Sequence, residues 1–300
     1  MENISKLRIW YLAIRPKTLP AACGPVILGT GLAFGDGVFE LVPAIACLLV
    51  ALLLQIGSNL ANDVLDFKKG ADTKERTGPL RVTQAGLLTP REVLAGTVVV
   101  FALAAVVGLY LIYLGGWPIF LLGLLAIISA VAYTGGPFPL GYLGLADIFV
   151  FFFFGPVAVV GTYYLQAGSV AEVAWWASIP PGLLITALLV VNNLRDIETD
   201  RKAGKKSLPV RFGVKFTRIY YTSLLSLSYL IPLILWLTGR APFLVLLAWL
   251  TLPLAVPLIR DVFTKKGSPL NMTLAATAKL GLLFSILFAV GYVFAALGTF

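Results

Sequence analysis

Two clusters of carboxylate and amide side chains interrupt a very apolar chain, at residues 59–66 (NLANDVLD) and 192–200 (NNLRDIETD). Each follows an apolar run long enough to be a membrane helix. Spacings of four residues place Asn192, Asp196 and Asp200 on one helical face, and the acids of the first cluster nearly share another. Carboxylates that face each other at a membrane boundary repel unless a cation binds between them. The pattern therefore predicts a metal site.

The residue types limit which metal this is. Histidine is absent, and the only cysteines, Cys23 and Cys47, stand singly in apolar runs. The usual sets of protein ligands for zinc, haem and iron–sulfur clusters, and the base for a His-activated nucleophile, are therefore missing from the sequence. Oxygen ligands suit Mg²⁺, with Mn²⁺ as a possible substitute. We expect two opposed helix ends to hold Mg²⁺ through the acids Asp63, Asp66, Asp196 and Asp200, with an oxygen from Asn62 and from Asn192 or Asn193.

Basic residues follow each acidic cluster, including Lys68 and Arg81 after the first and Lys205 after the second. Metal-binding acids beside cations are what diphosphate chemistry requires, because both neutralise charge on a departing diphosphate. Two simpler interpretations remain open. The acids could be solvated helix caps, and the bases could record membrane topology and anionic lipid.

Composition predicts a multi-pass membrane protein, with 59% hydrophobic residues, 12% charged residues and a mean hydropathy of +0.93. No removable signal peptide is expected. The net charge of +9 is attributed to membrane orientation and not to nucleic acid. Nine apolar runs of spanning length predict nine transmembrane helices, at residues 19–34, 41–58, 93–114, 117–134, 145–165, 173–194, 219–237, 242–259 and 272–297.

With nine spans, every Lys and Arg except Arg240 falls on one side of the membrane. The positive-inside rule makes that side cytoplasmic. We therefore expect a cytoplasmic N-terminus, an active site that faces the cytoplasm, and location in the cell (inner) membrane. The two acidic clusters, each followed by a basic loop, suggest a single domain over residues 1–300 built from two helical halves, about 1–140 and 141–300, around a central cavity.

Two uncharged segments, a glycine-rich loop and a phenylalanine run, could contact the substrate. Residues 133–142 (YTGGPFPLGY) lie in a loop expected to be cytoplasmic, yet contain no Lys or Arg. Their glycines and hydroxyls suit a phosphate ligand, although a plain tight turn is the alternative. The phenylalanine run at residues 151–154 is expected to face lipid, with a tunnel for an isoprenoid tail as the alternative.

The motifs Asn62-Asp63-x-x-Asp66 and Asp196-x-x-x-Asp200 resemble those of the UbiA superfamily of intramembrane aromatic prenyltransferases, which are nine-helix bundles. Residues 15–19, 59–72, 77–81, 133–144 and 192–208 are most similar to the branch that acts on 1,4-dihydroxy-2-naphthoate. One departure is that the usual third acid of the first motif would fall at Gly70, and Asp72 is only the nearest candidate.

This resemblance implies Mg²⁺-dependent transfer of a polyprenyl group from polyprenyl diphosphate to 1,4-dihydroxy-2-naphthoate, with loss of CO₂, in menaquinone biosynthesis. Membrane lipids are the surrounding partners. The implied catalytic residues are Asp63, Asp66, Asp196 and Asp200, and Asn62 joins them as a metal ligand. The implied diphosphate ligands are Arg15, Lys68, Tyr133 and Lys205, and Arg81 is the candidate for the aromatic carboxylate.

Three other functions stay open at this stage. A related enzyme could prenylate another acceptor, such as 4-hydroxybenzoate, homogentisate or a tetrapyrrole. A cation-coupled transporter also carries inward acids on facing helices, although usually near the membrane midplane. A non-catalytic binder of prenyl lipids would show affinity without turnover.

Overall fold

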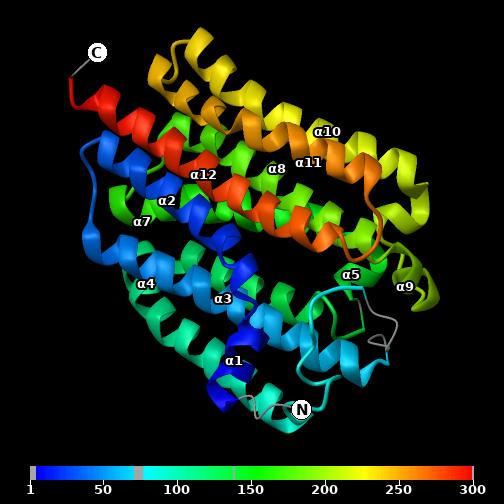
Figure 1. Ribbon diagram of the computed structural model, residues 1–300. Helices are drawn as coiled ribbons and strands as arrows, with labels where there is room; N and C mark the ends of the chain where they lie inside the picture. The colour runs from blue at the N-terminus through cyan, green and yellow to red at the C-terminus, as the bar shows by residue number, and fades with distance from the viewer. Residues whose placement is uncertain (1–4, 71–76, 138, 299–300) are drawn as a thin grey trace.

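The computed structural model describes residues 5–70, 77–137 and 139–298, whose helices form one bundle (Figure 1). No strand occurs in these ranges. Seven helices are long and apolar enough to cross a membrane, or eight if the bent pair Lys6–Thr18 and Pro20–Gly35 is one span. The predicted all-helical, multi-pass architecture is confirmed. Asp72 lies outside the described residues.

Most helices follow one another closely along the chain, and the longest connection, residues 69–89, joins α3 to α4. In chain order they are α1 (Lys6–Ile14), η1 (Pro16–Thr18), α2 (Pro20–Gly35), α3 (Leu41–Lys68), α4 (Pro90–Ala132), α5 (Leu140–Leu143), α6 (Ala146–Phe152), η2 (Phe153–Val157), α7 (Ala158–Ala167), α8 (Glu172–Arg195), α9 (Ile197–Lys202), α10 (Leu208–Leu237), η3 (Phe243–Thr251), α11 (Leu252–Thr264) and α12 (Leu270–Ala296).

The predicted span 93–114 lies within α4, which has 43 residues, and the span 117–134 extends only two residues beyond its end. At about 1.5 Å per residue, a straight helix of this length would be roughly twice as long as the hydrocarbon core is thick. The helix is not straight, because Gly116 has non-helical dihedral angles of φ 69° and ψ −156°. Glycine tolerates this conformation, whereas a β-carbon would clash with the backbone. The break therefore falls between the two predicted spans.

Small residues allow the central helices to approach closely. A β-carbon placed on Gly31 of α2 would lie 2.5 Å from the β-carbon of Ala289 on α12. On the same two helices, a β-carbon on Gly24 would lie 3.2 Å from the carbonyl oxygen of Gly281. Without a hydrophobic force between helices in lipid, such close packing is a main source of association. Both sites lie along the α2–α12 contact at the centre of the bundle (Figure 1).

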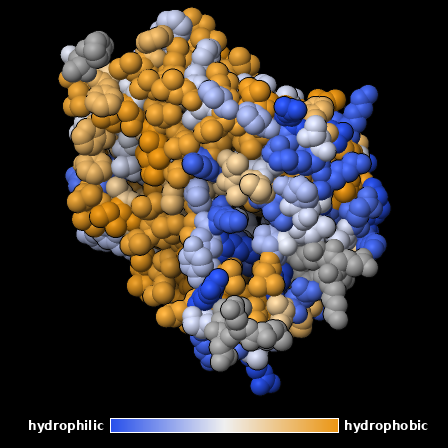
Figure 2. Space-filling view, in the orientation of Figure 1, coloured by the Kyte–Doolittle hydropathy of each residue, from blue (hydrophilic) through white to orange (hydrophobic). Residues whose placement is uncertain are grey.

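The surface separates into a hydrophobic and a hydrophilic region (Figure 2). Large apolar side chains such as Tyr113 and Trp117 of α4 are exposed, as expected for helices that contact lipid. Hydrophilic residues gather at the right of the view, where the ends of α3 and α8 lie with α5 and α9. The two acidic clusters therefore lie at the same end of the bundle.

Candidate functional site at the polar end of the bundle

The first acidic cluster lies inside α3, which continues ten residues beyond the predicted end at residue 58. Asn59 anchors this stretch by donating to the carbonyl oxygen of Ile14 and to Thr18 Oγ1, both at 3.0 Å. Asn62 Oδ1 accepts a hydrogen bond from Thr134 Oγ1 at 2.9 Å. Helical geometry thus carries the acids into the bundle instead of into a loop, and Asp63 and Asp66 are both buried.

The second cluster is not one continuous helix. The prediction of a single face through Asn192, Asp196 and Asp200 is wrong in this respect, because α8 ends at Arg195 and α9 begins at Ile197. Asp196 joins them with φ −97° and ψ 11°. The amide of Asp200 still donates to the Asp196 carbonyl oxygen at 2.8 Å. The bend lets both aspartates remain buried.

Asp66 and Asp200 come from the two clusters and act on each other electrostatically. Asp200 is buried, and this burial is the main reason that its pKa lies above the ordinary aspartate value. Lys205, at 3.1 Å, opposes the shift in pKa, while the negative charges of Asp196 and Asp66 reinforce it. The tertiary fold therefore brings the two clusters near each other, as the prediction of a metal site between opposed carboxylates requires.

The four aspartates differ in how far their oxygens are already engaged. Both oxygens of Asp63 accept backbone amides, from Val82 and Thr83, at 3.1 Å. Both oxygens of Asp196 accept from Arg195. By contrast, Asp66 Oδ1 is buried with no hydrogen-bond partner among the described residues. Asp200 contacts Lys205 through Oδ1. Asp66 and Asp200 are thus the acids best able to accept a metal ion.

This donor set fits Mg²⁺. Across the described part of the chain, no three acidic or thiol side chains form a ready-made metal cage. Mg²⁺ does not need one, because it commonly binds one or two carboxylates and completes its shell with water and phosphate oxygens. A buried carboxylate oxygen without a hydrogen bond is costly unless a cation occupies it. Asp66 Oδ1 is such an oxygen.

The structure distributes the predicted basic residues in different ways. Arg81 is buried and donates to Asp66 Oδ2 at 2.8 Å, and Lys205 contacts Asp200. Lys68 is exposed at the end of α3. Arg15 follows α1 in a left-handed conformation with φ 53°. Arg81 and Lys205 therefore lie directly at the acids, and Arg81 is committed to a carboxylate of the protein.

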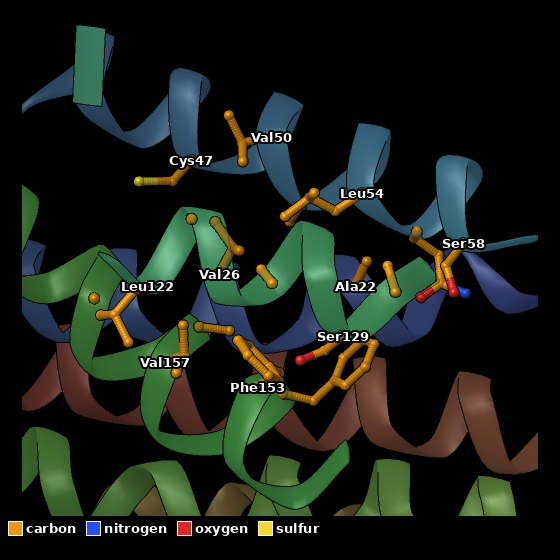
Figure 3. A pocket seen from close by; sticks show the side chains of 18 of the residues that line it. Ala22, Val26, Cys47, Val50, Leu54, Ser58, Leu122, Ser129, Phe153 and Val157 are labelled. Carbon is orange, nitrogen blue, oxygen red and sulfur yellow. The ribbon is translucent and has the colours of Figure 1, made fainter. Parts of the chain in front are cut away.

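Tyr133 lies where the polar end meets an apolar cavity. Its side chain lines the cavity, and the charges of Asp200, Asp147 and Asp66 act on its hydroxyl. The cavity has a volume of about 270 Å³ and is bounded mainly by α2, α3, α4, α6 and α7. Figure 3 shows Cys47, Val50, Leu54 and Ser58 of α3 along one side of it. Tyr133 therefore connects this cavity to the acids of both clusters.

The phenylalanine run lies partly in this cavity, so the expectation that it faces lipid is wrong for two of its members. Phe153 and Phe154 line the cavity, whereas Phe152 is exposed. The π-helical turn η2 changes the angular spacing of side chains at this point. Sequence periodicity assumes a regular helix and could not reveal this rotation.

A polar network supports the second cluster, and sequence reasoning missed most of it. The Arg195 guanidinium is buried and donates to Asp196, Asn192 and Asn271. Asn271 of α12 donates to the carbonyl oxygen of Thr77 at 2.9 Å, and Thr77 Oγ1 donates to Asp196 at 3.0 Å. The only available signal was an amide at the start of the last apolar run. Asp147, a buried acid of α6, was also missed.

The fold and the site define a class of protein, namely a helical membrane protein in which Tyr133 links an apolar cavity to two buried acidic clusters. Comparison with known proteins makes this more specific. The sequence pattern of the UbiA prenyltransferase family matches residues 22–273, which is most of the chain. The chain belongs to the UbiA prenyltransferase family.

Curated relatives are similar over nearly the whole length. The 1,4-dihydroxy-2-naphthoate octaprenyltransferase of Haemophilus influenzae is 39% identical over 295 residues, covering 95% of this chain and 96% of the relative. The Escherichia coli enzyme of the same name is 39% identical over 298 residues, covering 97% and 96%. That of Mycobacterium tuberculosis is 42% identical over 228 residues, covering 76% and 78%.

Solved structures share the fold at low sequence identity. A UbiA homologue from Aeropyrum pernix superposes with a TM-score of 0.69 at 14% identity, covering 90% of this chain and 97% of the homologue. A homologue from Archaeoglobus fulgidus, solved with DMAPP and Mg²⁺ bound, gives 0.61 at 18% identity, covering 97% and 99%. The predicted UbiA-type fold is therefore confirmed.

Proposed function

We propose that this protein transfers a polyprenyl group from polyprenyl diphosphate to 1,4-dihydroxy-2-naphthoate, releasing diphosphate and CO₂, in menaquinone biosynthesis. The main support is that Asp66 and Asp200, from two distant clusters, act electrostatically on each other and on Tyr133, which lines the apolar cavity. Relatives named for this reaction are about 40% identical over most of the chain. The enzymatic class and the acceptor follow from these relatives, and the site explains how the chain performs the chemistry.

Asp66 and Asp200 are proposed as the main metal ligands, with Asn62 close by and Mn²⁺ as a substitute ion. When bound, Mg²⁺ supplies Lewis-acid stabilisation of the leaving diphosphate. Asp63 and Asp196 act differently from the sequence-based proposal, in that they hold the surrounding chain in place. Asp63 fixes the backbone at residues 82–83, next to Arg81. Asp196 is fixed by Arg195 and Thr77.

The remaining residues bind and shield the substrates. Lys205 lies beside Asp200, where its charge would neutralise a diphosphate oxygen. Arg15 and Lys68 remain proposed diphosphate ligands, and Arg81 remains the proposed partner of the acceptor carboxylate, a role for which it would have to share its contact with Asp66. Tyr133 lies where C1 of the prenyl group would be placed. The apolar cavity would hold the prenyl chain and keep water from the allylic cation.

In the chemical step, the C1–O bond of the prenyl diphosphate breaks and the electron pair leaves with the diphosphate. An electron-rich ring carbon of the naphthoate attacks C1, and the ring carboxylate departs as CO₂. No side chain forms a covalent bond to substrate. The contribution of the protein is placement, charge stabilisation and exclusion of water.

The topology belongs to this proposal as well. We propose nine spans, because the break at Gly116 divides α4 into two segments and α2 forms a span of its own. The N-terminus and the active site would face the cytoplasm, in the inner membrane of a bacterial cell. In support, Lys69, Lys205 and Lys206 lie at the polar end, while Arg240 pairs with Glu172 elsewhere. The two halves, about 1–140 and 141–300, would each supply one acidic cluster.

The experiment is to incubate the purified full chain in lipid with labelled 1,4-dihydroxy-2-naphthoate and a polyprenyl diphosphate, with Mg²⁺ or with EDTA, and to determine the product mass. We expect a decarboxylated prenyl naphthoquinol and free diphosphate only with Mg²⁺. If 4-hydroxybenzoate, homogentisate or a tetrapyrrole is prenylated instead, the proposed acceptor is wrong and the prenyl transfer stands. Cation-driven solute uptake into proteoliposomes without diphosphate release would contradict the enzymatic function altogether.

A further inference from the structure

The ring of Tyr142, in the short helix α5, contacts lysines that follow both acidic clusters. Lys69 Nζ lies 4.7 Å and Lys205 Nζ lies 5.1 Å from the ring centroid. We infer that Tyr142 is a positioning residue that holds these two ammonium groups together, so that they bind one diphosphate group jointly. This inference rests on the proposed function and adds to it a mechanism for recognising the diphosphate.

The contact joins two distant parts of the chain. Lys69 comes three residues after Asp66, and Lys205 comes five residues after Asp200. Because both ammonium groups lie within about 5 Å of one centroid, they are at most about 10 Å apart. Tyr142 therefore brings one cation from each cluster onto a single ring, and Lys205 also contacts Asp200, one of the acids proposed to bind the metal.

The position of the ring does not depend on the ring contacts themselves. The Tyr142 carbonyl oxygen accepts the amide of Lys206 at 2.9 Å, and the Leu143 carbonyl oxygen accepts Arg211 Nη2 at 2.8 Å. At Gly144, with φ 74°, an added β-carbon would lie 2.4 Å from the Lys206 carbonyl oxygen. The backbone of α5 is thus fixed to the chain after the second cluster, and a side-chain change at Tyr142 leaves these bonds in place.

Electrostatics explains why an aromatic ring that contacts both lysines would help diphosphate binding. Two neighbouring ammonium groups repel each other, and the negative face of an aromatic ring attracts both. Lys205 also pairs with Asp200, so a metal ion at Asp200 would compete with Lys205 for that carboxylate. Tyr142 gives the displaced ammonium group a second partner at the site. A diphosphate, with several anionic oxygens, can then accept hydrogen bonds from both lysines.

The test measures binding of inorganic diphosphate, with Mg²⁺ present, to the full chain in lipid nanodiscs by titration calorimetry. We expect Tyr142→Leu to weaken binding about tenfold, because the ring contacts are lost. Tyr142→Phe should stay within about twofold of wild type, because the ring remains. The control Tyr113→Leu, on the exposed face of α4, should have no effect. In turnover assays, Tyr142→Leu should raise KM for the prenyl diphosphate and not for the naphthoate.

A double-mutant cycle identifies the route of the effect. In a Lys69→Gln background, Tyr142→Leu should cost clearly less than it does in the wild type. Equal cost in both backgrounds would overturn the inference, as would wild-type binding by Tyr142→Leu or an equal loss in Tyr142→Phe. If Tyr142→Leu does not fold, diphosphate binding is compared between Lys69→Arg and Lys69→Gln. Only arginine keeps the contact with the ring, so equal loss of binding in both variants would overturn the inference. Because the probe is inorganic diphosphate and not the naphthoate, failure of naphthoate turnover would count against the proposed function and not against the role of Tyr142.

Discussion

Asp63 and Asp200 carry the same functional group in opposite surroundings. Asp63 is satisfied by two backbone amides, so its charge is compensated within the fold. Asp200 is buried with one lysine contact and its pKa is raised by that burial. An ionised carboxylate of the second kind is costly for folding unless a ligand compensates it. Such local cost is typical of functional sites.

This contrast predicts different effects of two matched substitutions. Asp200→Asn should reduce Mg²⁺-dependent turnover by about 10²-fold or more while leaving the protein as stable as wild type, because a buried charge is removed. Asp63→Asn should lower the free energy of unfolding by about 1–3 kcal/mol, because one amide loses its acceptor. Thermal unfolding in detergent and a diphosphate-release assay separate the two. Near-normal turnover by Asp200→Asn would remove the metal hypothesis.

At the scale of elements, α12 completes a site whose chemistry comes from α3, α8 and α9. Asn271 at the start of α12 accepts from Arg195 and donates to Thr77, both at 2.9 Å. Thr77 and Arg195 both contact Asp196. One amide side chain therefore connects the loop after the first cluster to the second cluster.

We expect Asn271→Ala to lower the free energy of unfolding by about 1–3 kcal/mol, because two partly buried hydrogen bonds lose their partner. Turnover should fall as well, because Asp196 and Arg195 lose their support. The neighbouring Met272→Ala is the control, since Met272 is exposed on the same helix. Unfolding followed by intrinsic fluorescence measures the first effect. Equal stability of both variants would show that the network adds nothing to the fold.

At the scale of the whole molecule, we propose that the volume of the cavity between the helices limits which prenyl chains bind. Gly161 of α7 lines the cavity, and a β-carbon there would meet no atom within 4 Å. A larger side chain at this position can therefore grow into the cavity without displacing the helices. Figure 3 shows that the cavity runs along α3 from Ser58 toward Cys47, so a blockage at one depth would affect long chains most.

Gly161→Leu should raise the KM for a long polyprenyl diphosphate about tenfold, equivalent to about 1.4 kcal/mol, and leave the KM for a short one nearly unchanged. Steady-state kinetics with a series of chain lengths measures this. Ala105→Leu, on an exposed position of α4, adds volume outside the cavity and serves as the control. An equal effect on short and long chains would indicate general damage instead of steric exclusion.

The amino-acid sequence was sufficient to predict the membrane class, the all-helical fold and the two acidic clusters. These follow from composition, from the length of apolar runs and from spacing, which are local properties of the chain. The resemblance to the UbiA superfamily also rested on local motifs, and the comparisons confirm it. The expectation that both acidic clusters lie near the membrane boundary rests on the same local properties, since polar residues at the end of an apolar helix are expected there.

The differences among these acids arise from contacts between helices and could not be predicted from the sequence. Whether a carboxylate oxygen is engaged depends on residues far away in the chain, such as Val82 for Asp63 and Arg81 for Asp66. The bend at Asp196, the π-helical turn before Ala158 and the role of Asn271 arise from packing between helices. Sequence periodicity describes one helix at a time, whereas a binding site is formed where several helices meet.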